Sequence, residues 1–112
     1  MAKAEEFFDN AELIADDPDR RNAAASLHVD AGIAASDVLC CAALGEHASG
    51  QSHDEALALL KKVDKEARKH LSTLLEKKTK ISYSADQLSV TEFVKVSRAA
   101  THLLEAARKV PR

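Results

Sequence analysis

The side chains best suited to chemistry lie near the start of the chain: Arg21, Asn22 and His28. On a helix, positions seven apart share one face and lie two turns, or roughly 10 Å, apart. A histidine exchanges protons near neutral pH, and a guanidinium holds a phosphate group bidentately. The pattern therefore predicts phosphodiester cleavage, with His28 as general acid or base, Arg21 as the phosphate clamp and Asn22 orienting either of them.

The same residues also have a plain structural interpretation. Arg21 then carries a solvent-facing charge at a helix start, and His28 flanks an apolar stripe. A second arginine and histidine, Arg98 and His102, stand nearer the C-terminus with three residues between them. The sequence leaves open which pair is relevant and whether either is catalytic.

Basic residues are concentrated in one part of the chain. Residues 61–80 contain eight basic and three acidic groups, whereas residues 1–20 contain two basic and seven acidic ones. The basic stretch predicts either a phosphate-binding surface or a solvated helix face. The net charge of -2 argues against a DNA-coating protein, and 4% aromatic residues without Trp argue against single-strand binding by base stacking.

No metal or cofactor site is predicted. The chain lacks phosphate-binding loops, dinucleotide-binding fingerprints, nucleophile elbows and His-Glu-x-x-His motifs. His47 and His53, with Asp54, lack a defined third ligand and give only a weak metal signal. The other glutamate and histidine neighbours are expected to pair on helix surfaces: Glu66 with His70, and His102 with Glu105.

Two cysteines and the N-terminus bear on the compartment. Cys40 and Cys41 are adjacent, which disfavours a disulfide between them, so both are expected to be reduced, buried, small apolar residues. The acidic N-terminus lacks the apolar core of a signal peptide, and no window has the ~18 apolar residues of a membrane span. We therefore expect a cytoplasmic protein without a membrane partner.

Composition predicts the fold class. With 112 residues, the chain has the size of one domain, which we assign to residues 1–112. Only three glycines and two prolines interrupt it, and 46% of the residues are hydrophobic. Few turn formers and many helix formers favour an all-α protein.

The periodicity predicts two helices in the first half. The first spans roughly residues 2–15, and Asp17 followed by Pro18 begins the second. Gly45 is expected to end that second helix. Its apolar stripe has a strict alternation of spacings of three and four: Ala24, Leu27, Ala31, Ala34, Val38 and Cys41.

Two further helices are predicted in the second half. Ser52 and Glu55 form a capping box, and no glycine or proline interrupts the helix after it before Thr79. Ser89 and Glu92 form a second box that opens the last helix. Four helices with short connections predict an antiparallel up-and-down four-helix bundle.

The second helix also predicts self-association. Its small residues at 31–36 allow close approach of another backbone, either from the same chain or from a second copy. Apolar residues flank these positions on both sides and give more hydrophobic width than a bundle of this size covers. We therefore expect a homodimer, with packing within one chain as the alternative for this face.

Three stretches together resemble the HEPN superfamily of small helical-bundle domains, in particular short actinobacterial members. They are an Ala-rich helix with its loop, a polar junction and a closing helix: SLHVDAGIAASDVLCCAALGEHASGQSHDEALALL, KKTKISYSADQLS and VTEFVKVSRAATHLLEAARKV. The resemblance spans most of residues 20–110 and is one of pattern and layout.

The resemblance implies an activity and partners. Active members are metal-independent ribonucleases with an Arg-x(4–6)-His motif at a dimer cleft, often paired with an antitoxin or found in phage-defence loci. Arg21 and His28 match that spacing but lie earlier than usual, whereas Arg98 and His102 are one residue too close. Lys78, Lys80 and Tyr83 resemble polar residues that line family clefts and are expected to contact RNA or a nucleotide. Members without the catalytic pair imply the alternative of a non-catalytic protein-interaction module, such as an antitoxin or adaptor.

Overall fold

The computed structural model describes residues 1–45, 53–83 and 86–111, with the side chain of Tyr83 outside the described part. The described residues form five α-helices and a short 3-10 helix, and they contain no strand, so the all-α prediction is confirmed. The elements are α1 (Ala2–Ile14), η1 (Pro18–Arg20), α2 (Arg21–Leu44), α3 (His53–Val63), α4 (Lys65–Tyr83) and α5 (Val90–Arg108).

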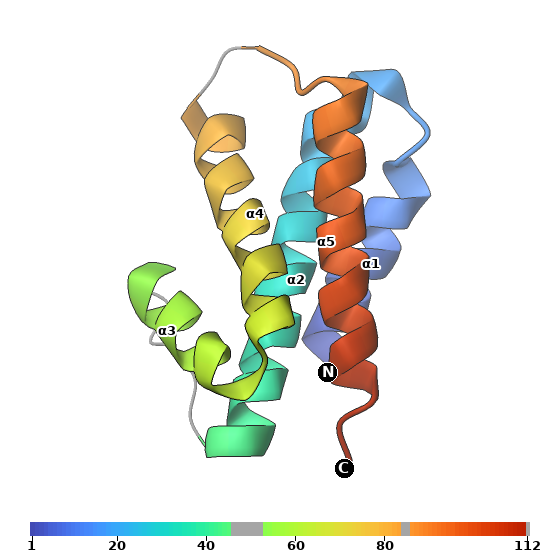
Figure 1. The fold of residues 1–112 in the computed structure, drawn as a ribbon. Coiled ribbons are helices and arrows are strands. Elements are labelled where there is room, and N and C mark those ends of the chain that lie inside the picture. Colours follow the sequence, from blue (N-terminus) through green and yellow to red (C-terminus); the bar gives the residue numbers. More distant parts are fainter. Residues whose placement is uncertain (46–52, 84–85, 112) are drawn as a thin grey trace.

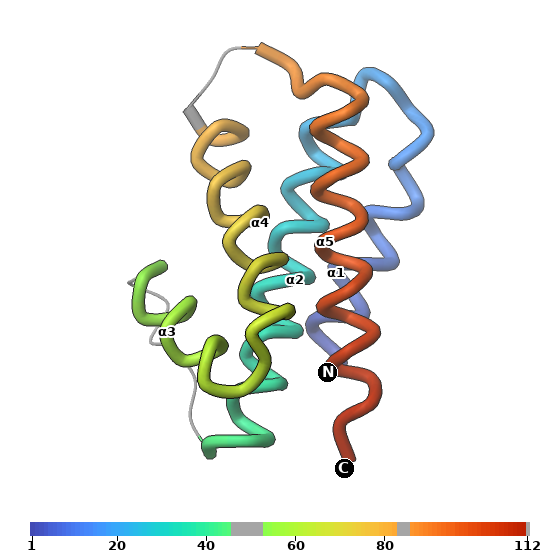
Figure 2. The backbone as a smooth tube through the Cα atoms, in the orientation of Figure 1, coloured from blue at the N-terminus to red at the C-terminus, as the bar shows by residue number. Residues whose placement is uncertain are grey.

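Helix α2 lies at the centre of the fold. Helices α1 and α4 flank it on two sides, and α5 packs along a third (Figure 1). The long helices α1, α2, α4 and α5 alternate in direction, whereas the short α3 lies beside the lower part of α4 (Figure 2). One central helix is therefore covered by four others, although not on its whole circumference.

The core depends on small residues along α2. A Cβ atom on Gly32 would lie 2.1 Å from Leu74 Cδ1 and 3.3 Å from Leu103 Cδ1, so this position brings α4 and α5 close to the α2 backbone. Leu74 and Leu103 are fully buried there, as are Ala31 and Ala35 of α2. Packing within the chain therefore occupies much of the small-residue face that predicted a dimer.

The helix ends agree with several sequence signals. Asp17 accepts a hydrogen bond from the Asp19 N–H at 2.9 Å and opens η1. Gly45 has a φ of 72°, the left-handed conformation expected of a glycine that ends a helix. The capping box of Ser89 and Glu92 is confirmed, whereas Ser52 of the other predicted box lies outside the described residues.

The prediction of one long helix after Ser52 is wrong, because Asp64 divides that segment into α3 and α4. The Asp64 carboxylate accepts from the N–H groups of Glu66 at 2.9 Å and Ala67 at 3.1 Å, so it caps a new helix. Its own N–H still donates to Leu60 O in the last turn of α3. The described part of the chain thus has five α-helices where four were expected.

One segment has the dimensions of a membrane span. Residues Pro18–Leu44 are long and apolar enough, by length and composition alone, to cross a membrane, contrary to the expectation that no window of the chain is. This evidence is weak, because 44% of that window is buried inside the fold and the core helix of a soluble protein passes the same test.

Replacing Asp64 tests its capping role. We expect Asp64→Ala to lower the free energy of unfolding by about 1 kcal/mol, because two N–H groups of α4 lose their acceptor. Asp64→Asn retains an acceptor oxygen and should stay close to the wild type in urea unfolding. Equal losses in both variants would contradict a capping role.

Candidate functional site

Arg21 and Asn22 hold the segment that leads into α5. Arg21 Nη1 donates to Leu88 O at 2.9 Å, and the Leu88 N–H donates to Asn22 Oδ1 at 2.9 Å. Leu88 itself is only 1% exposed. Both predicted site residues are therefore used to fix a backbone that lies more than sixty positions away in the sequence.

His28 is enclosed in the core. Its exposed fraction is 0%, and its ring meets the edges of Phe8 of α1 and Phe93 of α5, with ring centroids 5.4 and 5.8 Å away. Neither ring nitrogen has a hydrogen-bond partner, and the Nε2 atom lies 3.5 Å from Glu12 Oε1, beyond an ordinary hydrogen bond. The imidazole is thus held by aromatic side chains and not by polar groups.

Burial determines the protonation state of His28. Desolvation of the charged form lowers the pKa of His28 from 6.5 to about 4. The carboxylate of Glu12 is too loosely placed to reverse this effect. His28 is therefore neutral near pH 7.

The three predicted catalytic residues do not meet in a common cleft. None of Arg21, Asn22 and His28 lines the groove between α1 and α4, the cavity beside Cys40 or the hollow between α3 and α4. Arg21 and Asn22 are directed to Leu88, and His28 is directed between two aromatic rings. In the single chain, the contacts of all three residues are structural. Their catalytic role stays a prediction.

The predicted phosphate-binding residues separate onto two faces of α4. Lys80 Nζ lies 2.5 Å from Glu92 Oε2, and Lys77 Nζ lies 3.3 Å from the same oxygen. The lysine contacts and the Ser89 backbone hold the pKa of Glu92 down at about 2. Lys78 instead faces α2, and Tyr83 ends α4 with its side chain outside the described residues.

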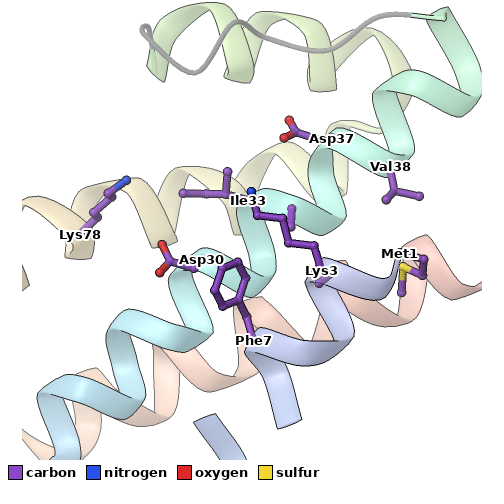
Figure 3. A pocket seen from close by; sticks show the side chains of 10 residues that line it. Met1, Lys3, Phe7, Asp30, Ile33, Asp37, Val38 and Lys78 are labelled. Carbon is purple, nitrogen blue, oxygen red and sulfur yellow. The ribbon is translucent and has the colours of Figure 1, made fainter. Parts of the chain in front are cut away.

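An open groove of about 390 Å³ lies between α1 and α4, with α2 as its floor (Figure 3). Its walls and floor combine apolar and charged side chains: Met1, Lys3, Phe7, Asp30, Ile33, Asp37, Val38 and Lys78, together with Ala4 and Ala34. Ile33, Ala34 and Val38 are only half-buried. The groove therefore contains part of the apolar stripe that the sequence predicts for α2.

Opposite charges face one another across this groove. Asp30 lies on the floor, where burial raises the pKa of its carboxyl above the ordinary value and outweighs the opposing effect of the Lys78 and Lys3 charges. Lys3 reaches from α1 with its Nζ atom 5.9 Å from the centre of the Phe7 ring. Sequence reasoning identified Lys78 but missed Lys3 and Asp30, because only the fold brings α1, α2 and α4 together.

A histidine pair joins α4 to α5. The rings of His70 and His102 stack with their centroids 4.0 Å apart. Burial and the neighbouring His102 lower the pKa of His70, and Glu66 Oε1 lies 3.9 Å from its Nε2 atom. The predicted Glu66–His70 pair is confirmed, whereas the stacking of His102 on His70 has no signal in residue spacing.

The two cysteines have different surroundings. Cys40 is buried, as predicted, and lines a cavity of about 90 Å³ with Ser36 and His53. The expectation that Cys41 is buried is wrong. The buried positions at that end of α2 are Ser36, Leu39 and Cys40, and Cys41 lies outside this face and is exposed. Neither Cys40 nor Cys41 forms a disulfide. The described residues contain no group of three or more His, Cys, Asp or Glu side chains that could hold a metal ion.

No known protein family, curated protein or solved structure matches the chain. The resemblance to HEPN proteins therefore stays a prediction.

Replacing Asn22 tests the connection to Leu88. We expect Asn22→Ala to lower the free energy of unfolding by about 1 to 3 kcal/mol, because the Leu88 N–H loses its acceptor. Asn22→Asp keeps an oxygen in the same place and serves as the control. Urea unfolding in which Asn22→Ala matches the wild type would contradict this role.

The stability of the chain should depend on pH through His28. Between pH 4 and 6.5 the unfolded chain binds more protons at this residue than the folded chain, so unfolding free energy rises with pH in that window. Because the neutral ring is retained above the window, the full contribution is present near pH 7. Lowering the pH from 7 to 4.5 is expected to reduce the free energy of unfolding of the wild type by about 2 to 3 kcal/mol more than that of His28→Leu.

Urea unfolding at several pH values measures this difference. His53→Leu is the matched control, because His53 is exposed. It should retain the wild-type dependence on pH. Parallel loss of stability in the wild type and in His28→Leu would show that the burial of His28 does not cause the effect.

Proposed function

We propose that this chain is a HEPN-like, homodimeric helical binding module that carries out no catalysis through Arg21 and His28. The observation that carries the proposal is the groove between α1 and α4, where the chain itself covers the apolar residues Ile33, Ala34 and Val38 of α2 only in part. Membership of a toxin–antitoxin or defence system, with an antitoxin as a further partner, remains part of the proposal and rests on the resemblance alone.

The half-buried apolar strip of α2, formed by Ile33, Ala34 and Val38, supports an interaction surface. Ala31 on the predicted stripe is fully buried by the chain, but Ala34 and Val38 on the same stripe are not. Ile33 beside them is also half-buried and faces the groove (Figure 3). Burial of such a strip by another helix removes apolar area from water and favours association.

The charges of the groove favour a second copy as the occupant. Lys3 and Lys78 lie on its walls, and Asp30 and Asp37 lie on its floor. In a two-fold interface each surface patch meets itself, so a patch with equal numbers of both charges offers opposite charges to its partner. A groove with charges of only one sign would repel a second copy of itself. This groove instead carries two lysines and two aspartates.

The placement of the predicted catalytic residues supports binding over cleavage. His28 has no exposed surface and a pKa of about 4, so it is not poised to exchange protons near pH 7. Arg21 donates to a backbone carbonyl in place of a phosphate. RNA cleavage by this pair would require both side chains to leave these contacts.

The oligomeric state tests the proposal. We expect the wild type to sediment at twice the 12.1 kDa mass of the chain at micromolar concentration. Ile33→Glu, which places a charge in the groove, should shift the protein to a monomer. Ala34→Arg offers a second variant at a smaller, half-exposed position, and it should have the same effect.

Leu13→Glu is the matched control, because Leu13 lies on α1 with 80% exposure and does not line the groove. It should remain a dimer. A wild-type monomer, or dimers in both groove variants, would contradict the proposed interface. Cleavage of RNA by the wild type in EDTA, lost in His28→Ala, would contradict a non-catalytic role and restore the ribonuclease prediction.

A further inference from the structure

Four cationic side chains line an open hollow of about 300 Å³ at the corner between α3 and α4. They are Lys61 at the end of α3 and Lys65, Arg68 and Lys69 at the start of α4. No other residue in the described part of the chain lines this hollow. The chain bends at Asp64, and that bend brings Lys61 to the same side as the α4 cations.

The stability of α4 does not account for these charges. A helix N-terminus carries a partial positive charge, so cations in the first turns of a helix are unfavourable and anions are favourable. Lys65, Arg68 and Lys69 all lie in that part of α4. These three α4 cations therefore oppose the dipole of α4 and repel one another beside the favourable Glu66, whereas Lys61 lies in the last turn of α3, where a cation is favourable.

Most of these cations lack an anionic partner among the described residues. Lys69 lies 3.5 Å from Glu66 Oε2, but no described carboxylate lies within 4.0 Å of Lys61, Lys65 or Arg68. Asp64 and Glu66 are the nearest acids in sequence: the Asp64 carboxylate accepts from two backbone N–H groups, and Glu66 pairs with Lys69. A bound anion would supply the missing counter-charge.

We propose that the corner between α3 and α4 binds a compact oligophosphate anion, either a short condensed phosphate or the phosphate chain of a nucleotide. Three lysines supply mobile ammonium donors, and the half-buried Arg68 supplies a planar guanidinium that pairs bidentately with phosphate oxygens. Several linked phosphates match several cations in one hollow better than a single phosphate does.

The distribution of charge favours a compact ligand over a long strand. The whole chain has a net charge of -2, so the surface outside this corner is predominantly acidic. Residues 1–20 alone contain seven acidic groups. Beyond residues 61–80, which are basic as a whole, a long polyanion would meet more acidic than basic side chains, whereas an oligophosphate stays at the four cations of the hollow.

Titration with tripolyphosphate tests the site. We expect binding by calorimetry at low salt, weakened as salt screens the charges, with amide chemical-shift changes concentrated in residues 61–69. Lys65→Gln with Arg68→Gln should raise the dissociation constant by at least about tenfold, because two unpaired charges leave the hollow. Lys65→Gln alone should give a smaller increase in the same direction, and it avoids altering the half-buried Arg68.

The matched control is Lys95→Gln with Arg98→Gln. It removes the same two residue types from exposed positions of α5 and changes the net charge equally. We expect its affinity to stay within about twofold of the wild type. A loss in the control as large as that at the corner would overturn the site, because net charge alone would then explain binding.

Two further ligands separate the sources of the phosphate. Adenosine triphosphate binding more tightly than tripolyphosphate would identify a nucleotide, and equal affinities would identify the phosphate chain alone; either result supports the corner. Absence of tripolyphosphate binding at low salt would overturn the proposal. Much tighter binding of single-stranded RNA through the same residues would also overturn it, in favour of a strand-binding surface.

Discussion

The close approach of α4 and α5 to the backbone of α2 at Gly32 is the constraint on which the fold depends. A single added Cβ atom at Gly32 would lie 2.1 Å from a methyl group of Leu74. Leu74 and Leu103 therefore fill the space that a side chain on α2 would otherwise take. Because α2 has no side chain there, α4 and α5 can both pack closely against it, while α1 packs along another part of its surface (Figure 1). Four helices pack around α2, and the groove lies along the strip of α2 between α1 and α4 that they cover only in part.

The sequence predicted the ends of helices well where a local capping signal sets them. It predicted less well the features that depend on contacts between helices. Asp17 with Pro18, Gly45, and Ser89 with Glu92 mark element ends that the structure confirms. The break at Asp64 was missed because the apolar spacing continues from Val63 to Ala67 without a glycine or proline. An aspartate is a common N-cap, but only its hydrogen bonds distinguish a cap from a surface charge.

The candidate site was harder to predict for a related reason. The spacing of Arg21 and His28 correctly places both on α2, but it contains no information on what the other helices bring to them. Phe8 and Phe93 come from opposite ends of the chain to enclose His28, and the Leu88 backbone comes from the approach to α5. The residues that suggest chemistry in the sequence thus become packing and positioning groups in the fold. The groove and the cationic corner combine residues from two or three helices and have no contiguous signature.

The unpaired imidazole of His28 has a consequence for motion. Helix α1 buries only Ala4 and Ala11 completely, and it covers His28 mainly through Phe8. When α1 separates from α2, water can hydrogen-bond to the ring nitrogens of His28. The free energy gained by this hydration offsets part of the cost of exposing apolar surface to water. Rehydration of the His28 nitrogens therefore lowers the free-energy cost of opening α1, compared with a helix that covers only apolar side chains.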